Sequence, residues 1–362
     1  MSLEKKRWVY VAAGFLLLLF SGLVYAWSIF VKPLEDEFGW LRSQTSLTFS
    51  ICMAMFCLGG LFAGFMTKKK SAAFNARLAS ILLCLGFAAS SRVNSLIWLY
   101  ISYGAVCGFG VGLVYNAVMG TVTKWFPYKQ GFISGVLLMG FGFGGMVLGQ
   151  TASALVNFTG FRKTFIILGI ASFIIIFTGS MFIVPPNEEF IKSLNKNEGK
   201  KSNREKFGDM EPGEMLKRRS FWLYFIWAVL LGASGLAVIG HASPMAQLLG
   251  APASSATFYA GLISIFNGAG RVITGLAYDK AGRKSAMVTV SLMFIISASV
   301  LAASFLTGNI YMLVLGFICT GLSYGGITPI NSAFINSFYG AKNFTMNFAL
   351  INLNLIAASF LG

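Results

Sequence analysis

The chain has 362 residues, of which 56% are hydrophobic and only 11% are charged, and its formal net charge is +16. Soluble globular proteins devote about 25% of their residues to charged side chains, so this composition excludes an ordinary soluble fold. The excess of positive charge does not indicate a nucleic-acid partner, because the basic residues lie in loops between apolar runs and form no aromatic-interleaved patch on a soluble domain.

Long segments of the chain contain no Asp, Glu, Lys or Arg, and several exceed the ~20 residues that a membrane-spanning helix needs. Hydrocarbon cannot satisfy free backbone groups, and the runs lack the alternation typical of barrel strands, so they predict helices. The expected fold class is an all-α polytopic membrane protein. In chain order, the predicted helices span residues 8–31, 44–66, 74–92, 95–122, 130–154, 163–184, 220–240, 256–277, 285–306, 309–330 and 343–362.

The predicted helices form two groups. Pro185 and Pro186 open a polar stretch rich in Lys and Asn, which is typical of a linker. We predict an N-terminal six-helix bundle at 1–184, a cytoplasmic linker loop at 185–219 and an incomplete C-terminal bundle at 220–362. Since eleven helices are predicted, we expect a twelfth to be missing from the second half.

Most of the 28 Lys and Arg residues lie in alternate loops, on the same side as the N-terminus. Cytoplasmic loops of membrane proteins carry the excess of these residues, so the N-terminus is expected to be cytoplasmic. We predict a multi-pass protein of the plasma membrane, the inner membrane of the cell, that is monomeric, contacts the lipid bilayer and binds no nucleic acid. The opposite side holds only Lys32, Arg42, Arg92, Arg162 and Lys163.

Arg271 is the only charged residue deep inside a predicted helix. Burying its charge in a membrane costs ~2.5–3.5 kcal/mol on insertion scales, so a compensating partner is required. All 12 acidic residues lie in loops or at helix ends, which leaves two interpretations. Arg271 either bonds backbone carbonyls and water as a structural pin or binds a substrate carboxylate with its guanidinium fork. We favour the carboxylate, in which case the empty site leaves Arg271 unpaired.

Other polar side chains are candidates for the same substrate-binding site. Asn267 precedes Arg271 by one helical turn and shares its face, where it contacts the carboxylate, orients Arg271 or bonds a neighbouring helix. Tyr25, Tyr115 and Tyr324 lie near the middle of their helices and are candidates for an orienting aromatic wall. Such residues also serve as core or interface anchors, which is the alternative for each of them.

The segment GLAYDKAGRK follows Arg271 and predicts a turn between two helices. Gly275 permits a close helix approach, and Asp279 is expected to cap the next helix or to pair with Arg283. Gly282 and Arg283 complete this candidate gating or turn motif at the cytoplasmic surface.

Glycine is frequent in the predicted helices. Gly140, Gly142 and Gly145 satisfy G-x-G-x-x-G, but no strand is predicted before them, so close helix packing is favoured over dinucleotide binding. The predicted helices carry no Ser/His/Asp set, no paired carboxylates and no His/Glu metal cluster. We therefore predict no catalytic residue, no metal site and no cofactor, and the protein is not expected to be an enzyme.

The two helix groups, the long basic central loop and the turn after the eighth helix resemble the major facilitator superfamily. Within it, the chain resembles the oxalate:formate antiporter family and, in part, the monocarboxylate transporters. The segments that carry the resemblance are YAWSIFVKPLEDEFGW (Tyr25–Trp40), GVGLVYNAV (Gly110–Val118), KWFPYKQGFISG (Lys124–Gly135), GEMLKRRSFW (Gly213–Trp222) and FNGAGRVITGLAYDKAGR (Phe266–Arg283).

This resemblance implies a transporter of two six-helix halves, in which Arg271 binds the substrate carboxylate and Tyr25 and Tyr115 help to form a central cavity. Oxalate carriers pair the arginine with a lysine on helix 11, whereas residues 343–362 contain no lysine and Ile351 falls near its place. One cation suits a monocarboxylate better than a dianion. The turn after helix 2, TKKKSAAFNAR, also departs from the family's Asp- and Gly-bearing motif.

We therefore expect a secondary transporter that moves small carboxylate anions by alternating access, as an antiporter with a monocarboxylate substrate. Proton-coupled monocarboxylate symport is the alternative, although the predicted helices offer no acidic proton carrier. From a different class, a non-transporting membrane sensor or scaffold is a further alternative, which an attached soluble signalling domain would support.

Overall fold

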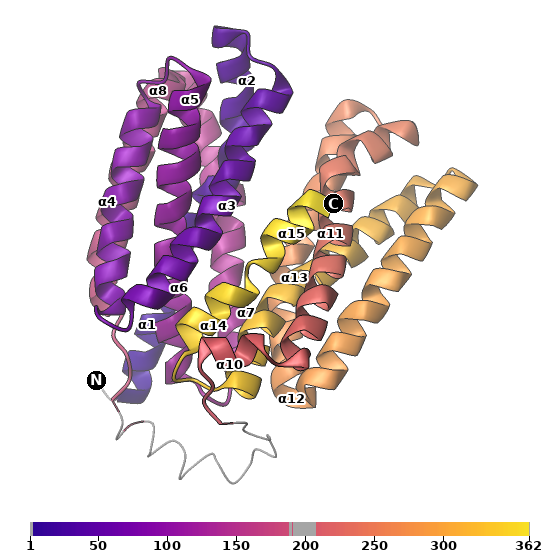
Figure 1. Cartoon of the computed structure of the whole chain (residues 1–362). Coiled ribbons are helices and arrows are strands. Elements are labelled where there is room, and N and C mark those ends of the chain that lie inside the picture. The colour runs from indigo at the N-terminus through magenta and orange to yellow at the C-terminus, as the bar shows by residue number, and fades with distance from the viewer. Residues whose placement is uncertain (1–2, 188–189, 191–207, 362) are drawn as a thin grey trace. The chain divides into compact units, whose positions relative to one another are not determined.

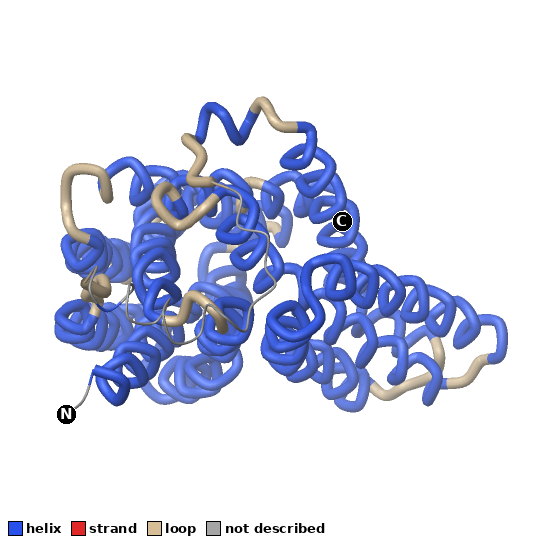
Figure 2. Tube along the Cα trace, turned by 90° about the horizontal axis from the view of Figure 1, so that it is seen from below, coloured by secondary structure: helices blue, strands red, loops and turns tan. Residues whose placement is uncertain are grey.

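The computed structural model describes residues 3–187, 190 and 208–361, and every regular element within them is a helix (Figures 1 and 2). Nine helices in this described part are long and apolar enough to cross a membrane, and Gln130–Phe143 is a shorter apolar helix. The predicted all-α membrane class is confirmed. Most of the linker predicted at 185–219 lies outside the described residues.

The chain forms two compact units, each described by itself. Two helices, α7 and α14, contribute residues to both units. Unit 1 comprises Met1–Pro127, Gly140–Asn203 and Phe344–Leu350, and unit 2 comprises Tyr128–Met139, Arg204–Asn343 and Ile351–Gly362. The halves predicted at 1–184 and 220–362 stay a prediction.

Unit 1 is built from helices that follow the charge-free runs of the sequence. Its helix α4 packs along α8, and α3 packs along α6 (Figure 1). The elements are α1 (Leu3–Ser21), the 3-10 helix η1 (Gly22–Ala26), α2 (Trp27–Phe38), α3 (Arg42–Met66), α4 (Ala72–Ser90), α5 (Leu96–Leu99), the π-helix η2 (Tyr100–Cys107), α6 (Gly108–Val122), η3 (Thr123–Trp125), the end of α7 (Gln130–Phe143), the π-helix η4 (Gly144–Leu148), α8 (Gly149–Gly179), η5 (Ser180–Phe182) and nearly all of α14 (Phe344–Ile351).

Glycines set the distance between α3 and α6. A Cβ atom added to Gly108 would lie 2.4 Å from the carbonyl oxygen of Cys52, and one added to Gly112 would lie 2.1 Å from that of Phe56. Real side chains cannot occupy that space, so the two backbones touch, as small residues permit in membrane helices. Close packing, the favoured role for the glycines, is confirmed here, and Gly140 likewise packs against the Phe15 backbone.

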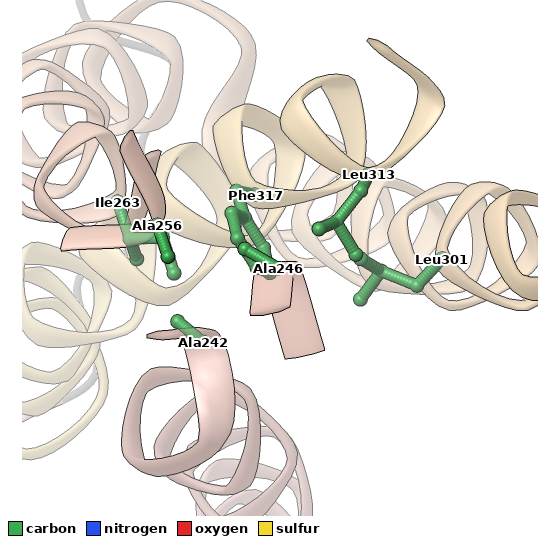
Figure 3. Packing of buried hydrophobic residues seen from close by; sticks show 7 residues of the cluster. All are labelled: Ala242, Ala246, Ala256, Ile263, Leu301, Leu313 and Phe317. Carbon is green, nitrogen blue, oxygen red and sulfur yellow. The ribbon is translucent and has the colours of Figure 1, made fainter. Parts of the chain in front are cut away.

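Unit 2 contains α12, the longest helix in the described part of the chain. Its α12 and α13 pack along one another, and alanines at the crossing with α11 form a core cluster with Ile263, Leu313 and Phe317 (Figure 3). The elements are the start of α7, α10 (Pro212–Leu216), α11 (Arg219–Leu248), α12 (Ala253–Thr307), α13 (Ile310–Tyr339) and α15 (Asn354–Leu361).

Two long helices are broken by glycines with positive φ. Gly160 (φ 78°, ψ 161°) interrupts α8, and Gly282 (φ 80°, ψ 177°) interrupts α12, each between two helices predicted from the sequence. Glycine reaches this backbone region without the steric penalty of a Cβ. Two predicted ends are too early, because α11 continues to Leu248 through Pro244 and α13 continues to Tyr339. The number of membrane crossings stays a prediction.

The described end of the linker docks on the turn after α13. The Met210 amide donates to the Tyr339 carbonyl at 3.0 Å, and the Lys342 amide donates to the Asp209 carboxylate at 3.0 Å. Gly340 (φ 81°) forms that turn. The linker thus enters α11 from a fixed position within unit 2.

Candidate functional site

Arg271 lies on α12 in unit 2, and only 7% of its surface is exposed. Its Nε donates a hydrogen bond to Oδ1 of Asn267 at 3.0 Å, and its Nη1 donates to the backbone carbonyl of Leu138 on α7. Arg271 therefore has hydrogen-bond partners without a ligand, and one of them is a backbone carbonyl, as the structural-pin interpretation expects. The side chain is long enough to reach a carbonyl of the neighbouring helix, which the sequence around it cannot reveal.

Both of these partners are neutral. The ion pairs of the described residues join Arg42 to Glu35 at 3.2 Å and Arg162 to Glu37 at 2.6 Å, and neither pair involves Arg271. Hydrogen bonds to neutral oxygens orient a guanidinium, but they do not neutralise its charge, and a buried charge without a counter-ion is costly. The site is therefore a buried, oriented cation that an anion would stabilise.

Close backbone packing fixes the position of Arg271. A Cβ added to Gly270 would lie 2.2 Å from the carbonyl oxygen of Leu322, and one added to Gly325 would lie 2.1 Å from that of Asn267. This stretch of α13 includes Tyr324, whose half-buried ring packs on Gly235 of α11. Three of the predicted site residues, Asn267, Arg271 and Tyr324, thus come from one region of unit 2.

The other two predicted site residues meet in unit 1. The rings of Tyr25 and Tyr115 both lie against Phe141, with centroid distances of 5.2 and 5.1 Å. Phe348 stacks on Tyr115 at 5.9 Å. Tyr25 lies on η1 and is 39% exposed, whereas Tyr115 is 2% exposed. Tyr25 is therefore an exposed member of this aromatic cluster, and Tyr115 is a buried one.

The turn motif has a different partner from the one expected. Asp279 does not cap the helix that follows it, since its Oδ1 and Oδ2 accept hydrogen bonds from the amides of Gly131 at 3.1 Å and Phe132 at 2.8 Å. These amides belong to the first turn of α7. Arg283, the other partner expected for Asp279, stacks on the Phe338 ring at 4.2 Å.

Removing the Asp279 carboxylate is expected to destabilise unit 2. The carboxylate satisfies two free amides and complements the positive end of the helix dipole, so Asp279→Ala should cost about 1–2 kcal/mol. Asp279→Asn keeps one acceptor oxygen and should cost less. Thermal unfolding in detergent measures both, with Lys280→Ala at the exposed neighbouring position as the control. Equal unfolding temperatures for Asp279→Ala and the control would contradict the capping role.

A break in the last predicted helix was not foreseen. The helix stops at Ile351 and restarts at Asn354, with Asn352 and Leu353 forming a turn between α14 and α15. Ile351, which falls near the place of the family's lysine, is fully buried, and Asn354 is 1% exposed with an Nδ2 that has no hydrogen-bond partner among the described residues. Asn352 and Asn354, two polar residues within an apolar run, are the sequence signal for this break.

The described residues contain no group of three or more His, Cys, Asp or Glu side chains arranged to hold a metal ion. The five cysteines are free thiols, and Cys52, Cys57 and Cys107 are buried. The candidate site residues can therefore recognise a ligand through the Arg271 guanidinium, the Asn267 amide and the tyrosine phenols.

Long apolar helices define an α-helical membrane protein. The Major Facilitator Superfamily model matches residues 9–362, and the chain belongs to this family.

Three relatives with similar sequences carry transporter descriptions. The chain is 27% identical to the oxalate:formate antiporter of Oxalobacter formigenes over 345 residues, which cover 93% of this chain and 80% of the relative. It is 24% identical to human monocarboxylate transporter 2 over 361 residues, covering 96% and 76%. It is also 25% identical over 351 residues to YhjX of Escherichia coli K12, an uncharacterized MFS-type transporter, covering 97% and 85%.

Solved structures share the fold at low identity. The proton:xylose symporter XylE bound to 6-bromo-6-deoxy-D-glucose is 16% identical, with a TM-score of 0.69 over 97% of this chain and 88% of that chain. A double tryptophan mutant of XylE gives a TM-score of 0.72 at 15% identity, over 99% and 87%. These similarities establish the fold alone.

Proposed function

We propose that the chain is a secondary transporter that exchanges small carboxylate anions by alternating access. Arg271 binds the substrate carboxylate, Asn267 orients the guanidinium, and Tyr25, Tyr115 and Tyr324 provide aromatic surfaces. The observation that carries the proposal is the buried Arg271 guanidinium, whose described partners are the neutral oxygens of Asn267 and Leu138. Relatives described as an oxalate:formate antiporter and a monocarboxylate transporter support the substrate class.

The substrate we propose is a monocarboxylate. No second Lys or Arg accompanies Arg271 in the described part of α11 to α15, because the other Lys and Arg residues of these helices lie at the helix ends or near the Gly282 break. A dianion such as oxalate would leave one carboxylate without a counter-ion in a poorly solvated site. A monocarboxylate leaves the occupied site neutral.

Proton-coupled symport is the second candidate. Symport needs a group that takes up a proton together with the substrate. The acidic residues of the described helices lie near helix ends, as Glu35, Asp36 and Asp279 do. Exchange is therefore the mode we favour.

We also propose an N-terminus in the cytoplasm and a location in the plasma membrane, the inner membrane of the cell. The distribution of Lys and Arg supports this orientation. We also propose that the protein is monomeric.

Proteoliposomes test the proposed function. We expect labelled formate or acetate to enter vesicles preloaded with unlabelled formate and to enter empty vesicles much more slowly. A pH gradient imposed with an ionophore should leave the exchange rate above that of protein-free vesicles unchanged, whereas symport would follow the gradient beyond the passive entry of the neutral acids. The proposal would be contradicted if formate, acetate and oxalate neither exchanged nor raised the unfolding temperature of the protein.

A further inference from the structure

In unit 2, the first half of α7 lies directly against α12. A Cβ added to Gly275 would lie 2.2 Å from the carbonyl oxygen of Gly131, and one added to Gly135 would lie 2.3 Å from that of Arg271. The backbones therefore touch at two levels, one helical turn apart, and no side chain separates them. The residue order shows that the two helices run antiparallel.

Charged side chains of α12 fasten this contact at both of its ends. At one end, the Asp279 carboxylate accepts the amides of Gly131 and Phe132 at 3.1 and 2.8 Å. At the other end, about two turns away, the Arg271 guanidinium donates to the Leu138 carbonyl. We name these two attachments the α7–α12 latch.

A third bond joins the same part of α7 to α13. The hydroxyls of Ser134 and Ser332 lie 2.7 Å apart, and both side chains are buried. Residues 131–138 of α7 are thus bonded to two helices of unit 2, and the proposed substrate-binding arginine supplies one of the bonds.

We propose that carboxylate binding to Arg271 breaks one of the two attachments of the α7–α12 latch, the bond between Arg271 and the Leu138 carbonyl. Nε stays with Asn267, and the carboxylate is bound by both terminal nitrogens through one N–H of each. On Nη1, that N–H is the one that Leu138 accepts in the empty site. An anionic oxygen is a stronger acceptor than a neutral carbonyl, so the substrate displaces the carbonyl. The inference rests on the proposed function, because it requires a carboxylate at Arg271.

The latch gives a physical basis for exchange. Without an anion, α7 is attached to α12 at both ends, and this arrangement is stabilised relative to any in which the helices separate. With an anion bound, only the Asp279 attachment and the Ser134–Ser332 bond remain. A ligand shifts a conformational equilibrium through such a difference in interaction between two states.

Disulfide cross-linking of Ser134→Cys/Ser332→Cys in proteoliposomes tests the inference. The 2.7 Å separation of the hydroxyl oxygens suits a disulfide, so the pair should cross-link rapidly with copper phenanthroline when no anion is present. Saturating formate should slow the reaction about tenfold, because loss of the Arg271 attachment raises the population of arrangements in which α7 has separated from both α12 and α13. Each single substitution, which retains the native cysteines, should give no cross-link.

Two outcomes of this experiment separate the inference from the proposed function. If formate raises the unfolding temperature but leaves the cross-linking rate unchanged, carboxylate binding stands and the latch is overturned. If formate, acetate and oxalate neither bind nor exchange, the proposed function fails and the latch fails with it.

A wedge between the helices provides an independent variant. In Gly135→Ala, the added methyl group cannot fit 2.3 Å from the Arg271 carbonyl, so α7 should move away and weaken the Arg271 attachment. In the Ser134→Cys/Ser332→Cys background without formate, we expect Gly135→Ala to lower the cross-linking rate about tenfold relative to the chain that keeps Gly135. We also expect this variant to release formate into anion-free buffer. Gly261→Ala on α12 is the control, because no atom lies within 4 Å of its added Cβ. Rapid cross-linking and strict exchange in Gly135→Ala would overturn the latch.

Discussion

Arg271→Gln is expected to abolish carboxylate binding and exchange while the protein still folds and inserts into the membrane. Glutamine retains hydrogen-bonding capacity toward Leu138 but carries no charge to balance an anion. Truncating one partner of a buried charge pair costs about 2–5 kcal/mol, so formate affinity should fall at least about thirtyfold. Counterflow of labelled formate and the formate-induced rise in unfolding temperature measure the effect. The folded state itself should gain stability, since a buried charge is removed.

Lys284→Gln is the matched control for this substitution. It removes the same charge from the same helix, at an exposed position beyond the Gly282 break. Formate exchange by this variant should equal that of the unsubstituted chain. Full exchange by Arg271→Gln would show that the substrate binds elsewhere and would remove the basis of the proposed site.

Asn267→Asp should inactivate the transporter by supplying a resident counter-ion. The new carboxylate would lie where Oδ1 of Asn267 now accepts from Arg271 Nε at 3.0 Å. A carboxylate attached to the same helix competes at an effective concentration of at least the millimolar range, so it excludes a weakly bound solute. We expect loss of formate exchange, loss of stabilisation by formate and a raised unfolding temperature without ligand, because the pair removes an uncompensated charge.

Asn309→Asp is the isosteric control for the added charge. Asn309 caps α13 by accepting the Tyr311 amide at 2.9 Å, and aspartate caps a helix equally well. This variant should therefore transport normally. Retained formate exchange in Asn267→Asp would mean that the guanidinium is not the anion's partner.

Local sequence was sufficient to predict the features that depend on one helix. The charge-free runs predicted the helices because membrane length and backbone satisfaction leave few alternatives. The spacing of Asn267 and Arg271 placed them on one helix face, and their hydrogen bond confirms this contact. The turn between two helices was predicted from the segment GLAYDKAGRK, and the positive φ of Gly282 breaks α12 within that segment.

Features that depend on two distant segments were not predictable in this way. Asp279 is 147 residues from Phe132 along the chain, and nothing near either residue specifies the other as its partner. The Leu138 carbonyl is a backbone group that every residue possesses, so no residue type signals its role. The different exposures of Tyr25 and Tyr115 likewise depend on Phe141 and Phe348, from two further helices.

The absence of an acidic partner for Arg271 among the described residues also has an electrical consequence. An occupied site with one monoanion is neutral, whereas a vacant site carries a full positive charge inside the membrane field. Moving one elementary charge across a membrane voltage of 100 mV changes its free energy by about 2.3 kcal/mol. The voltage therefore acts on the charged vacant carrier and does not act on the neutral loaded carrier. One-for-one swapping of monoanions is then electroneutral, and the resting potential of the cell neither drives nor opposes it.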